Sequence, residues 1–228
     1  MPEAAMPSRS WLPLAVFGLA LAAAGWRIPQ VPPPVLSAAV APRFVPAELP
    51  PAAQLSPERP SLTRLPNGNI AVAWLERGDT ENAAIWMAIS DGKNWRDIGK
   101  IASRESTAGA TFMHARALGR PILWAEGGWL HLWYEAYPLG RWAGASIIHS
   151  MSTDGGRNWN RTQRLASSAF GGLGSQLGGW PLELADGGLM LPLAQADEAA
   201  SWLRLAATGR VIDKLERLPE ASTPEASR

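Results

Sequence analysis

Residues 152–159 read STDGGRNW and directly follow the apolar run SIIHSM, a pattern typical of a strand that ends in a tight turn. Glycine reaches positive φ without steric cost, and Asp in a turn accepts hydrogen bonds from backbone amides two residues on. Trp159 is placed to fold back over this turn. A shorter copy, SDGKNW, occupies residues 90–95 after the apolar run AAIWMAI. Two such turns indicate a repeated β-hairpin.

The two turns belong to a larger repeat of about sixty residues. Its copies begin at Pro60, Pro121 and Pro181, and each runs through a short apolar strand, a turn with glycine seven or eight residues after the proline, and a second apolar strand. In the third copy the final turn is due near residue 211, where ATGR follows the strand-like SWLRLAA. One such unit cannot bury both faces of its own sheet, so the repeat predicts a β-propeller or another array of stacked β-units.

The predicted strand pairs cover 60–65 and 69–75, 84–90 and 95–101, 120–125 and 129–136, 145–152 and 159–165, and 179–184 and 188–194, with a further strand over 201–207 and no long helix. The chain has 228 residues, of which 46% are hydrophobic and twelve are tryptophan. Most of these tryptophans are expected to pack between sheets. The remainder are candidates for stacking on sugar rings.

Composition excludes several classes of function. The net charge of +1 lacks the electrostatic footprint of a nucleic-acid-binding protein. The chain has no cysteine, so disulfides, thiolate catalysis and cysteine metal sites are ruled out. It has only three histidines and no H-E-x-x-H pattern, so no metal or other cofactor is expected.

The N-terminus predicts export to the periplasm or cell envelope. Arg9 precedes an apolar run over residues 11–25, which is short for a membrane span and typical of the core of a signal peptide. Ala22 and Ala24 offer a small-x-small cleavage site, whereas Trp11 and Trp26 at the two ends fit an uncleaved membrane anchor. Both interpretations stay open. The predicted organisation is therefore a signal peptide or anchor over 1–28, a Pro/Ala-rich linker over 29–57, propeller blades over 58–213 and a polar, disordered tail over 214–228.

These residues resemble the sialidase (neuraminidase) superfamily, in particular bacterial Asp-box or BNR-repeat sialidase-like proteins. STDGGRNW matches the Asp-box pattern S-x-D-x-G-x-x-W, SDGKNW looks like a shortened form, and flanks such as PSLTRLPNGNIAVAW and GRPILWAEGGWLHLWY resemble those proteins as well. The resemblance covers about residues 56–213. It implies an all-β, sialidase-like β-propeller, with about three four-stranded blades of a six-bladed fold. It also implies that the boxes are structural and lie on turns at the rim away from the substrate, through Ser90, Asp91, Trp95, Ser152, Asp154, Gly156 and Trp159.

The resemblance implies hydrolysis of terminal sialic acid from glycoconjugates. Such a site holds the sugar carboxylate with arginines and uses a general acid, together with a tyrosine nucleophile assisted by a glutamate. The catalytic candidates are Asp79, in the acidic loop LERGDTEN, and Tyr134 and Glu135, in the segment WYEAYPLGRW. The candidates for substrate binding are Arg59, His114, Arg120, Tyr137, Arg141 and Trp142. We interpret WYEAYPLGRW as a substrate-facing loop, and it holds both tyrosines of the chain.

The chain departs from the family at two places. The family's first arginine lies in an R-I-P triplet, whereas here Glu58-Arg59-Pro60 shifts it by one residue, which on a regular strand turns the side chain to the other face. The family's tyrosine nucleophile and further arginines come from later blades, for which this chain has no matching segment.

Half a propeller leaves sheet faces open, so three interpretations follow. The chain is an inactive truncated relative, or it associates with a second copy or a separate second half. Alternatively, it is a non-catalytic carbohydrate-binding or envelope-associated module. A polysaccharide lyase with His114 and Tyr134 as base and acid is a weaker alternative. Expected partners are sialylated or other acidic glycans, and the membrane if residues 11–25 are uncleaved.

Overall fold

The computed structural model describes residues 15–19, 34–36, 57–76, 83–139, 144–167, 174–194 and 201–216. The chain divides into two compact units, residues 1–33 and 34–228. In the first unit, residues 15–19 form a short helical segment. No helix in the described part of the chain is long and apolar enough to cross a membrane. Most of the predicted signal or anchor segment and of the linker lies outside the described residues.

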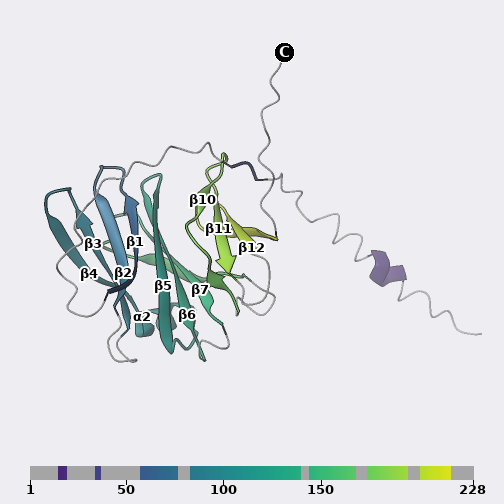
Figure 1. Ribbon diagram of the computed structural model, residues 1–228. Helices are drawn as coiled ribbons and strands as arrows, with labels where there is room; N and C mark the ends of the chain where they lie inside the picture. The colour runs from purple at the N-terminus through teal and green to yellow at the C-terminus, as the bar shows by residue number, and fades with distance from the viewer. Residues whose placement is uncertain are drawn as a thin grey trace, which may run out of the picture. The chain divides into compact units, whose positions relative to one another are not determined.

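The second unit consists mainly of three antiparallel sheets that lie side by side (Figure 1). Sheet 1 contains β1 (Pro57–Arg64), β2 (Ile70–Glu76), β3 (Ala84–Ser90) and β4 (Trp95–Ser103). Sheet 2 contains β5 (Ala117–Glu126), β6 (Trp129–Tyr137), β7 (Ser146–Ser152) and β8 (Asn160–Arg164). Sheet 3 contains β9 (Gln176–Leu177), β10 (Leu182–Glu183), β11 (Leu189–Ala194), β12 (Ser201–Leu205) and β13 (Val211–Leu215).

The predicted glycine turns lie at the first hairpin of each sheet. Gly68, Gly128 and Gly187 have φ of +86°, +85° and +76°, values that L side chains rarely adopt. The turn expected near residue 211 also forms, with Gly209 at φ +77° between β12 and β13. The repeat of strand, glycine turn and strand is thus confirmed in all three units.

Two differences from the sequence prediction concern short elements. The third unit closes with strand β13, so Lys214 and Leu215 belong to the sheet, and the predicted tail begins too early. A helix of eight residues, α2 (Arg104–Thr111), joins sheets 1 and 2. It is started by a capping box between Ser103 and Ser106, in which each side chain bonds the backbone amide of the other. A capping box with Ser at both positions is a weak pattern in sequence.

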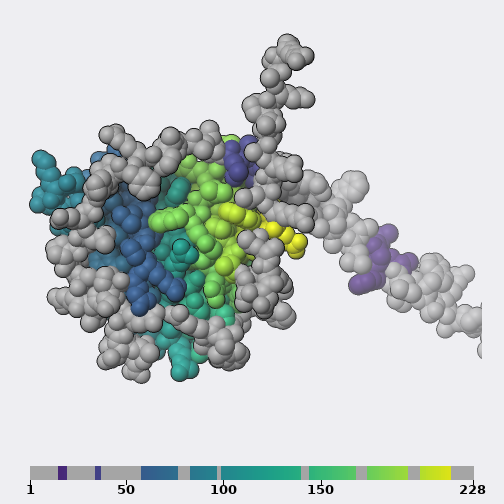
Figure 2. All heavy atoms as spheres, viewed as in Figure 1, coloured from purple at the N-terminus to yellow at the C-terminus, as the bar shows by residue number. Residues whose placement is uncertain are grey.

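Alternation of side chains along the strands builds a core on both faces of sheet 2. Tyr134 packs with buried residues of sheet 1 such as Leu75 and Ile85. Its neighbour Trp133 points the opposite way and packs with Leu191 and other buried residues of sheet 3. Successive residues of a strand face opposite sides, so one strand serves two interfaces. Atoms of the three sheets adjoin one another in the space-filling view (Figure 2).

The first strands of sheets 1 and 2 are joined by side-chain hydrogen bonds to the backbone. The Leu123 amide donates to Ser61 Oγ at 2.7 Å, and the Ala125 amide donates to Thr63 Oγ1 at 3.0 Å. Strand edges carry backbone groups without a ladder partner, which are costly to leave unpaired when buried. Hydroxyl groups at alternate positions of β1 therefore satisfy the edge of β5.

The STDGGRNW turn is braced from within. Ser152 Oγ accepts from the Gly156 amide at 2.8 Å and donates to Asp154 Oδ1 at 2.8 Å. Backbone and side-chain hydrogen bonds from Asn158 stabilise the Asp154 carboxylate and lower its pKa to about 2. Trp159 Nε1 donates to the Gly156 carbonyl at 3.0 Å. These contacts, with Gly156 lying against Met87 of sheet 1, make the turn a connector between sheets.

Replacing Ser152 by Ala is expected to lower the free energy of unfolding by about 1–2 kcal/mol, because the buried Gly156 amide loses its acceptor. Urea unfolding followed by tryptophan fluorescence measures the change. The exposed neighbour Thr153 gives the matched control, since Thr153→Ala removes a hydroxyl from the same turn and is expected to be neutral. Equal unfolding midpoints for both variants would contradict a bracing role for Ser152.

Candidate functional site

A β-bulge interrupts the first strand of sheets 1 and 2 at the same place. In β1 the register with β2 shifts between Glu58 and Ser61, and in β5 the register with β6 shifts between Leu118 and Pro121. Each bulge lies just before, or includes, the proline that opens the sequence repeat. In sheet 3 the corresponding strand is interrupted between β9 and β10. Bulges bend a strand and re-aim its side chains, often next to functional sites.

Arg59 lies within the bulge of β1, so its one-residue shift from the family's arginine position does not simply turn its side chain to the other face of the sheet. Arg59 has a left-handed backbone with φ of +54°, which is uncommon for a residue other than glycine and costs on the order of 1 kcal/mol. Regular alternation therefore fails at this residue. Arg59 and Arg120 each directly precede the proline of their repeat, and both line the same pocket.

This pocket, which we call the inner-strand pocket, has a volume of about 410 Å³. It collects side chains from the first strands of all three sheets and one from β6. Its lining consists of Arg59, Pro60, Arg120, Glu135, Gln176 and Leu177. The structure thus brings together three of the residues expected from sequence, namely Arg59, Arg120 and Glu135.

Glu135 is the most constrained group of the pocket. It is 2% exposed, and its Oε1 accepts from the Leu177 amide at 3.0 Å. Its Oε2 accepts from the Tyr137 hydroxyl at 2.8 Å and from the Arg120 amide at 3.4 Å. Gly119 makes room for this carboxylate, since a Cβ there would meet Glu135 Oε2 directly. Glu135 therefore connects sheet 2 to the first strand of sheet 3.

Arg120 forms a second link across the same interface. Its Nη1 donates to the Leu177 carbonyl at 3.2 Å, while the Leu177 amide is bound by Glu135. The two side chains thereby hold both backbone groups of one residue of β9. Two arginines and one carboxylate line the pocket, so its local charge is positive and favours an anionic ligand.

The structure separates Tyr134 from Glu135. Both residues lie in strand β6, not in a loop as expected from sequence, so they point to opposite faces of sheet 2. The Tyr134 hydroxyl is buried and lies 2.9 Å from Thr107 Oγ1 of α2, and burial raises its pKa to about 12. The tyrosine that contacts Glu135 is Tyr137, two residues along the same face.

The remaining candidates are His114, Asp79, Arg141 and Trp142. His114 is exposed and does not line it. Asp79, Arg141 and Trp142 lie outside the described residues. Gln176 and Leu177 were not predicted as site residues, because the third unit was expected to start at residue 179. The signal available was weak: GSQLGGWP contains only a two-residue strand before its glycine pair.

A metal centre has no ligand set in this part of the molecule. Among the described residues, no group of three or more His, Asp or Glu side chains is arranged to hold an ion.

A family model for the BNR repeat-like domain matches residues 68–222, most of the sheet-forming part of the chain. The chain belongs to the BNR repeat-like family. The expectation of a BNR-repeat protein is confirmed at this level, whereas the narrower sialidase assignment is not decided by the match. No curated protein sequence matches this BNR repeat-like protein.

Solved structures similar to the BNR repeat-like protein include β-propeller glycoside hydrolases. A family 117 glycoside hydrolase of Zobellia galactanivorans superposes with a TM-score of 0.53 at 15% identity, covering 70% of this chain and 55% of that one. A GH43_1 enzyme of Xanthomonas citri gives a TM-score of 0.52 at 12% identity, over 71% of this chain and 55% of its own. The chain thus spans little more than half of these enzymes, and the likeness identifies a shared propeller fold.

Proposed function

We propose that this BNR repeat-like protein is a sialidase-like, glycan-active protein whose inner-strand pocket binds a terminal acidic sugar. The observation that supports this proposal is the convergence of Arg59 and Arg120, from bulges in two different sheets, on one pocket. Planar guanidinium groups match a carboxylate through paired hydrogen bonds. Sialic acid carries such a carboxylate and stands at the ends of glycan chains, so it is the ligand class that we favour.

In this proposal Tyr137 takes the role that was expected of Tyr134. Tyr137 is 4% exposed and does not itself line the pocket, so the reaction requires its hydroxyl to become accessible beside Glu135. Its hydroxyl already donates to Glu135 Oε2 at 2.8 Å, so the carboxylate can accept the proton as the tyrosine oxygen bonds the anomeric carbon. The glycosidic bond breaks in the same step, and its oxygen takes a proton from a general acid, for which Asp79 is the candidate. Water then releases the sugar from Tyr137.

A non-catalytic glycan-binding module is the second candidate function. Two observations favour it: Glu135 is occupied by the Leu177 and Arg120 amides, and Tyr137 is only 4% exposed. Hydrolysis of a fluorogenic sialoside by the full chain separates the two functions. Release of the fluorophore that is lost in Tyr137→Phe supports the hydrolase, and binding without release supports the module.

The proposal also covers the cellular location of the protein and its association with a second chain. We place it outside the cytoplasm, as the apolar run over 11–25 predicts, and we propose that a second copy or a separate chain completes the propeller. Light scattering of the full chain in detergent at several concentrations measures its mass. A dimer of defined mass supports completion by a second copy. A monomer leaves completion to a different chain.

The lyase alternative receives no support from the described geometry. His114 is exposed, whereas the Tyr134 hydroxyl is buried against Thr107 with a raised pKa. A base and an acid that act on one sugar must face the same space. These two residues do not line the inner-strand pocket.

Replacing Arg120 by Ala is expected to weaken binding of sialyllactose by roughly tenfold or more, equivalent to about 1.4 kcal/mol or more, because the carboxylate loses a paired partner. Isothermal titration calorimetry with sialyllactose and with lactose measures the effect. Arg59→Ala provides a second test, since Arg59 is exposed and its loss disturbs no bond to Leu177. The matched control is Arg116→Ala, an exposed arginine just before β5 that lies outside the pocket.

Sialyllactose affinity that is unchanged in both Arg59→Ala and Arg120→Ala would refute the arginine pair as the carboxylate site. Equal affinity of the wild-type chain for lactose and sialyllactose would refute recognition of an acidic sugar altogether.

A further inference from the structure

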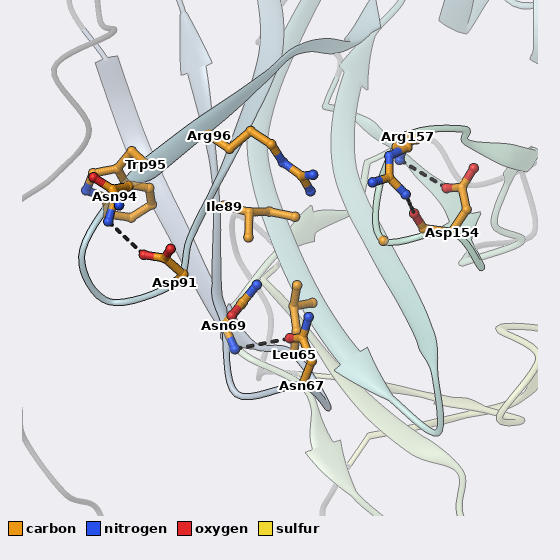
Figure 3. Close-up of a pocket in the computed structure, with 11 residues that line it drawn as sticks. Leu65, Asn67, Asn69, Ile89, Asp91, Asn94, Trp95, Arg96, Asp154 and Arg157 are labelled. Carbon is orange, nitrogen blue, oxygen red and sulfur yellow. Dashed lines mark hydrogen bonds between the residues drawn. The ribbon is translucent and has the colours of Figure 1, made fainter.

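A second cavity, of about 460 Å³, is lined by residues that follow β1, at the opposite end of that strand from Arg59. Figure 3 shows the residues that line it. It is open to solvent and bordered by the β1–β2 turn, by the SDGKNW turn of sheet 1 and by the STDGGRNW turn of sheet 2. We call it the rim pocket. Its volume is within the range of small-molecule sites, about 300–1,000 Å³, and large enough for more than one sugar ring.

The base of the rim pocket is apolar. Leu65 and Ile89 are 8% and 4% exposed and belong to the core between sheets 1 and 2. Trp95, which begins β4, also borders the pocket, but its ring packs with Val72 and Trp74 on the other face of sheet 1. Carbon-bound hydrogens of a sugar ring pack well on the apolar surface that Leu65 and Ile89 provide.

The walls of the rim pocket carry hydrogen-bond donors. Asn67 Oδ1 accepts from the Asn69 backbone amide at 3.1 Å, so the side-chain amino group of Asn67 is the end that serves as a donor. Arg96 is exposed and reaches from β4 into the space between the two Asp-box turns (Figure 3). Arg157 lies across this space, with Nη1 donating to the Asp154 carbonyl at 3.4 Å.

Acceptors alternate with these donors. Asp91 Oδ1 accepts from the Lys93 amide at 2.8 Å and from the Asn94 amide at 2.7 Å, and these bonds lower the pKa of the carboxyl group. Asp91 therefore stays ionised and remains an acceptor at neutral pH. The Asp154 carboxylate stands on the other side of the pocket, in the same charge state.

The combination of donors and carboxylate acceptors in the lining favours a sugar over an inorganic anion. An inorganic anion accepts hydrogen bonds from the arginines and is repelled by the carboxylates of Asp91 and Asp154. A sugar hydroxyl both donates and accepts, so it can pair with either kind of wall group while the ring covers Leu65 and Ile89. We propose that the rim pocket is a second glycan-binding site, which takes a neutral stretch of an oligosaccharide chain.

Such a site would be an additional attachment point for the glycan. It lies at a different position from the inner-strand pocket and binds a neutral sugar instead of an acidic one. A glycan held at the rim raises the local concentration of its neighbouring branches around the protein. The inference stands on the lining of the rim pocket alone, so it is independent of the function proposed for Arg59 and Arg120.

The test is a titration of the full chain with three neutral oligosaccharides, lacto-N-neotetraose, xylotriose and maltotriose. At least one is expected to bind the wild type, and Arg96→Ala is expected to weaken that binding by about tenfold, because hydrogen bonds to charged groups are among the stronger ones. Arg157→Ala provides a second exposed variant that removes a lining side chain without touching the core. The matched control is Lys100→Ala, an exposed cation on the same strand β4 that does not line the pocket.

The two pockets are separated by Arg120→Ala, which is expected to leave neutral-glycan binding unchanged. The proposal is overturned if none of the three oligosaccharides binds, or if Arg96→Ala and Arg157→Ala both bind like the wild type. It is also overturned if Arg120→Ala abolishes the binding, since the ligand would then occupy the inner-strand pocket. Displacement of the glycan by inorganic sulfate at equal concentration would reassign the rim pocket to anions.

Discussion

Lowering the pH from about 7.5 to about 5 is expected to reduce the free energy of unfolding by about 4 kcal/mol, of which about 2 kcal/mol comes from each of two buried histidines. His131 on β6 and His149 on β7 are 1% and 0% exposed. Burial lowers the pKa of His131 to about 4. Burial, with the charge of His131, lowers the pKa of His149 to about 3.

The packing around the two rings explains why they stay neutral. His131 Nδ1 and His149 Nε2 are 3.0 Å apart, so one ring donates to the other, and the bond cannot form when both rings are protonated. Both rings stack with Trp133, at centroid distances of 5.4 and 5.3 Å. Gly209 of sheet 3 closes over His149, since a Cβ there would lie 2.6 Å from Nδ1. A proton on either ring would be a buried charge without a counter-ion.

The sign follows from the unfolded chain, in which both histidines titrate near pH 6.5. Below that pH the unfolded state binds protons that the folded state excludes, so stability falls with the pH between about 6.5 and about 4. Asp154 and Asp186, whose pKa values are lowered by hydrogen bonds, lose their contribution only in more acidic solution. Glu126 has the opposite effect: burial raises its pKa, so its contribution to the free energy of unfolding increases as the pH falls.

Urea unfolding at the two pH values measures this loss. The double variant His131→Phe, His149→Phe keeps two aromatic rings beside Trp133 and is expected to lose most of the acid sensitivity. His114→Gln removes the exposed histidine and is expected to retain it. The histidine pair is not the acid-sensitive element if the wild type and the double variant lose the same free energy between the two pH values.

Replacing Gly119 by Ala is expected to lower the free energy of unfolding by about 3 kcal/mol and to abolish binding of sialyllactose. The new methyl group would meet Glu135 Oε2, and it would lie 2.8 Å from Glu135 Cβ and 2.9 Å from Tyr137 Cε2. Glu135 cannot move without releasing the Leu177 amide and the Tyr137 hydroxyl. The substitution therefore reaches both the sheet 2–sheet 3 interface and the inner-strand pocket.

Gly109→Ala provides the matched control. Gly109 lies in α2, and no atom of the described residues outside its own helix turn comes within 4 Å of the place that a methyl group would take. Ala is therefore expected to stabilise the helix by up to about 1 kcal/mol. Hydrogen exchange gives a local readout, because the Leu177 amide should exchange faster in Gly119→Ala and unchanged in Gly109→Ala. Protection of this amide that is the same in Gly119→Ala and in wild type would show that Glu135 tolerates the methyl group.

The repeat unit was predictable from sequence because its signals are local. Gly68 and Gly128 mark positions of positive φ, and apolar runs such as AAIWMAI mark buried strands. β13 and α2 were missed for the opposite reason. The last two residues of β13, Lys214 and Leu215, were assigned to the polar tail, and they belong to a strand because β12 offers an edge to pair with.

The site residues also separate into those that local sequence predicted and those that only the fold identified. Residue type and position before Pro60 and Pro121 were enough to select Arg59 and Arg120, and the segment around Glu135 was selected for its cluster of polar groups. The partner of Glu135 was misassigned to Tyr134, because treating the segment as a loop discards the alternation that places Tyr137 on the same face.

The sequence by itself determined the β-repeat, its turns and the family, since hydrophobic alternation and glycine positions act within one hairpin. Only the tertiary structure decided which polar side chains share a space. A bulge of one residue reverses the face of Arg59, and the Leu177 amide reaches Glu135 across 42 residues of chain. These contacts depend on how three sheets stack, and no local pattern encodes the distance between atoms that different sheets bring together.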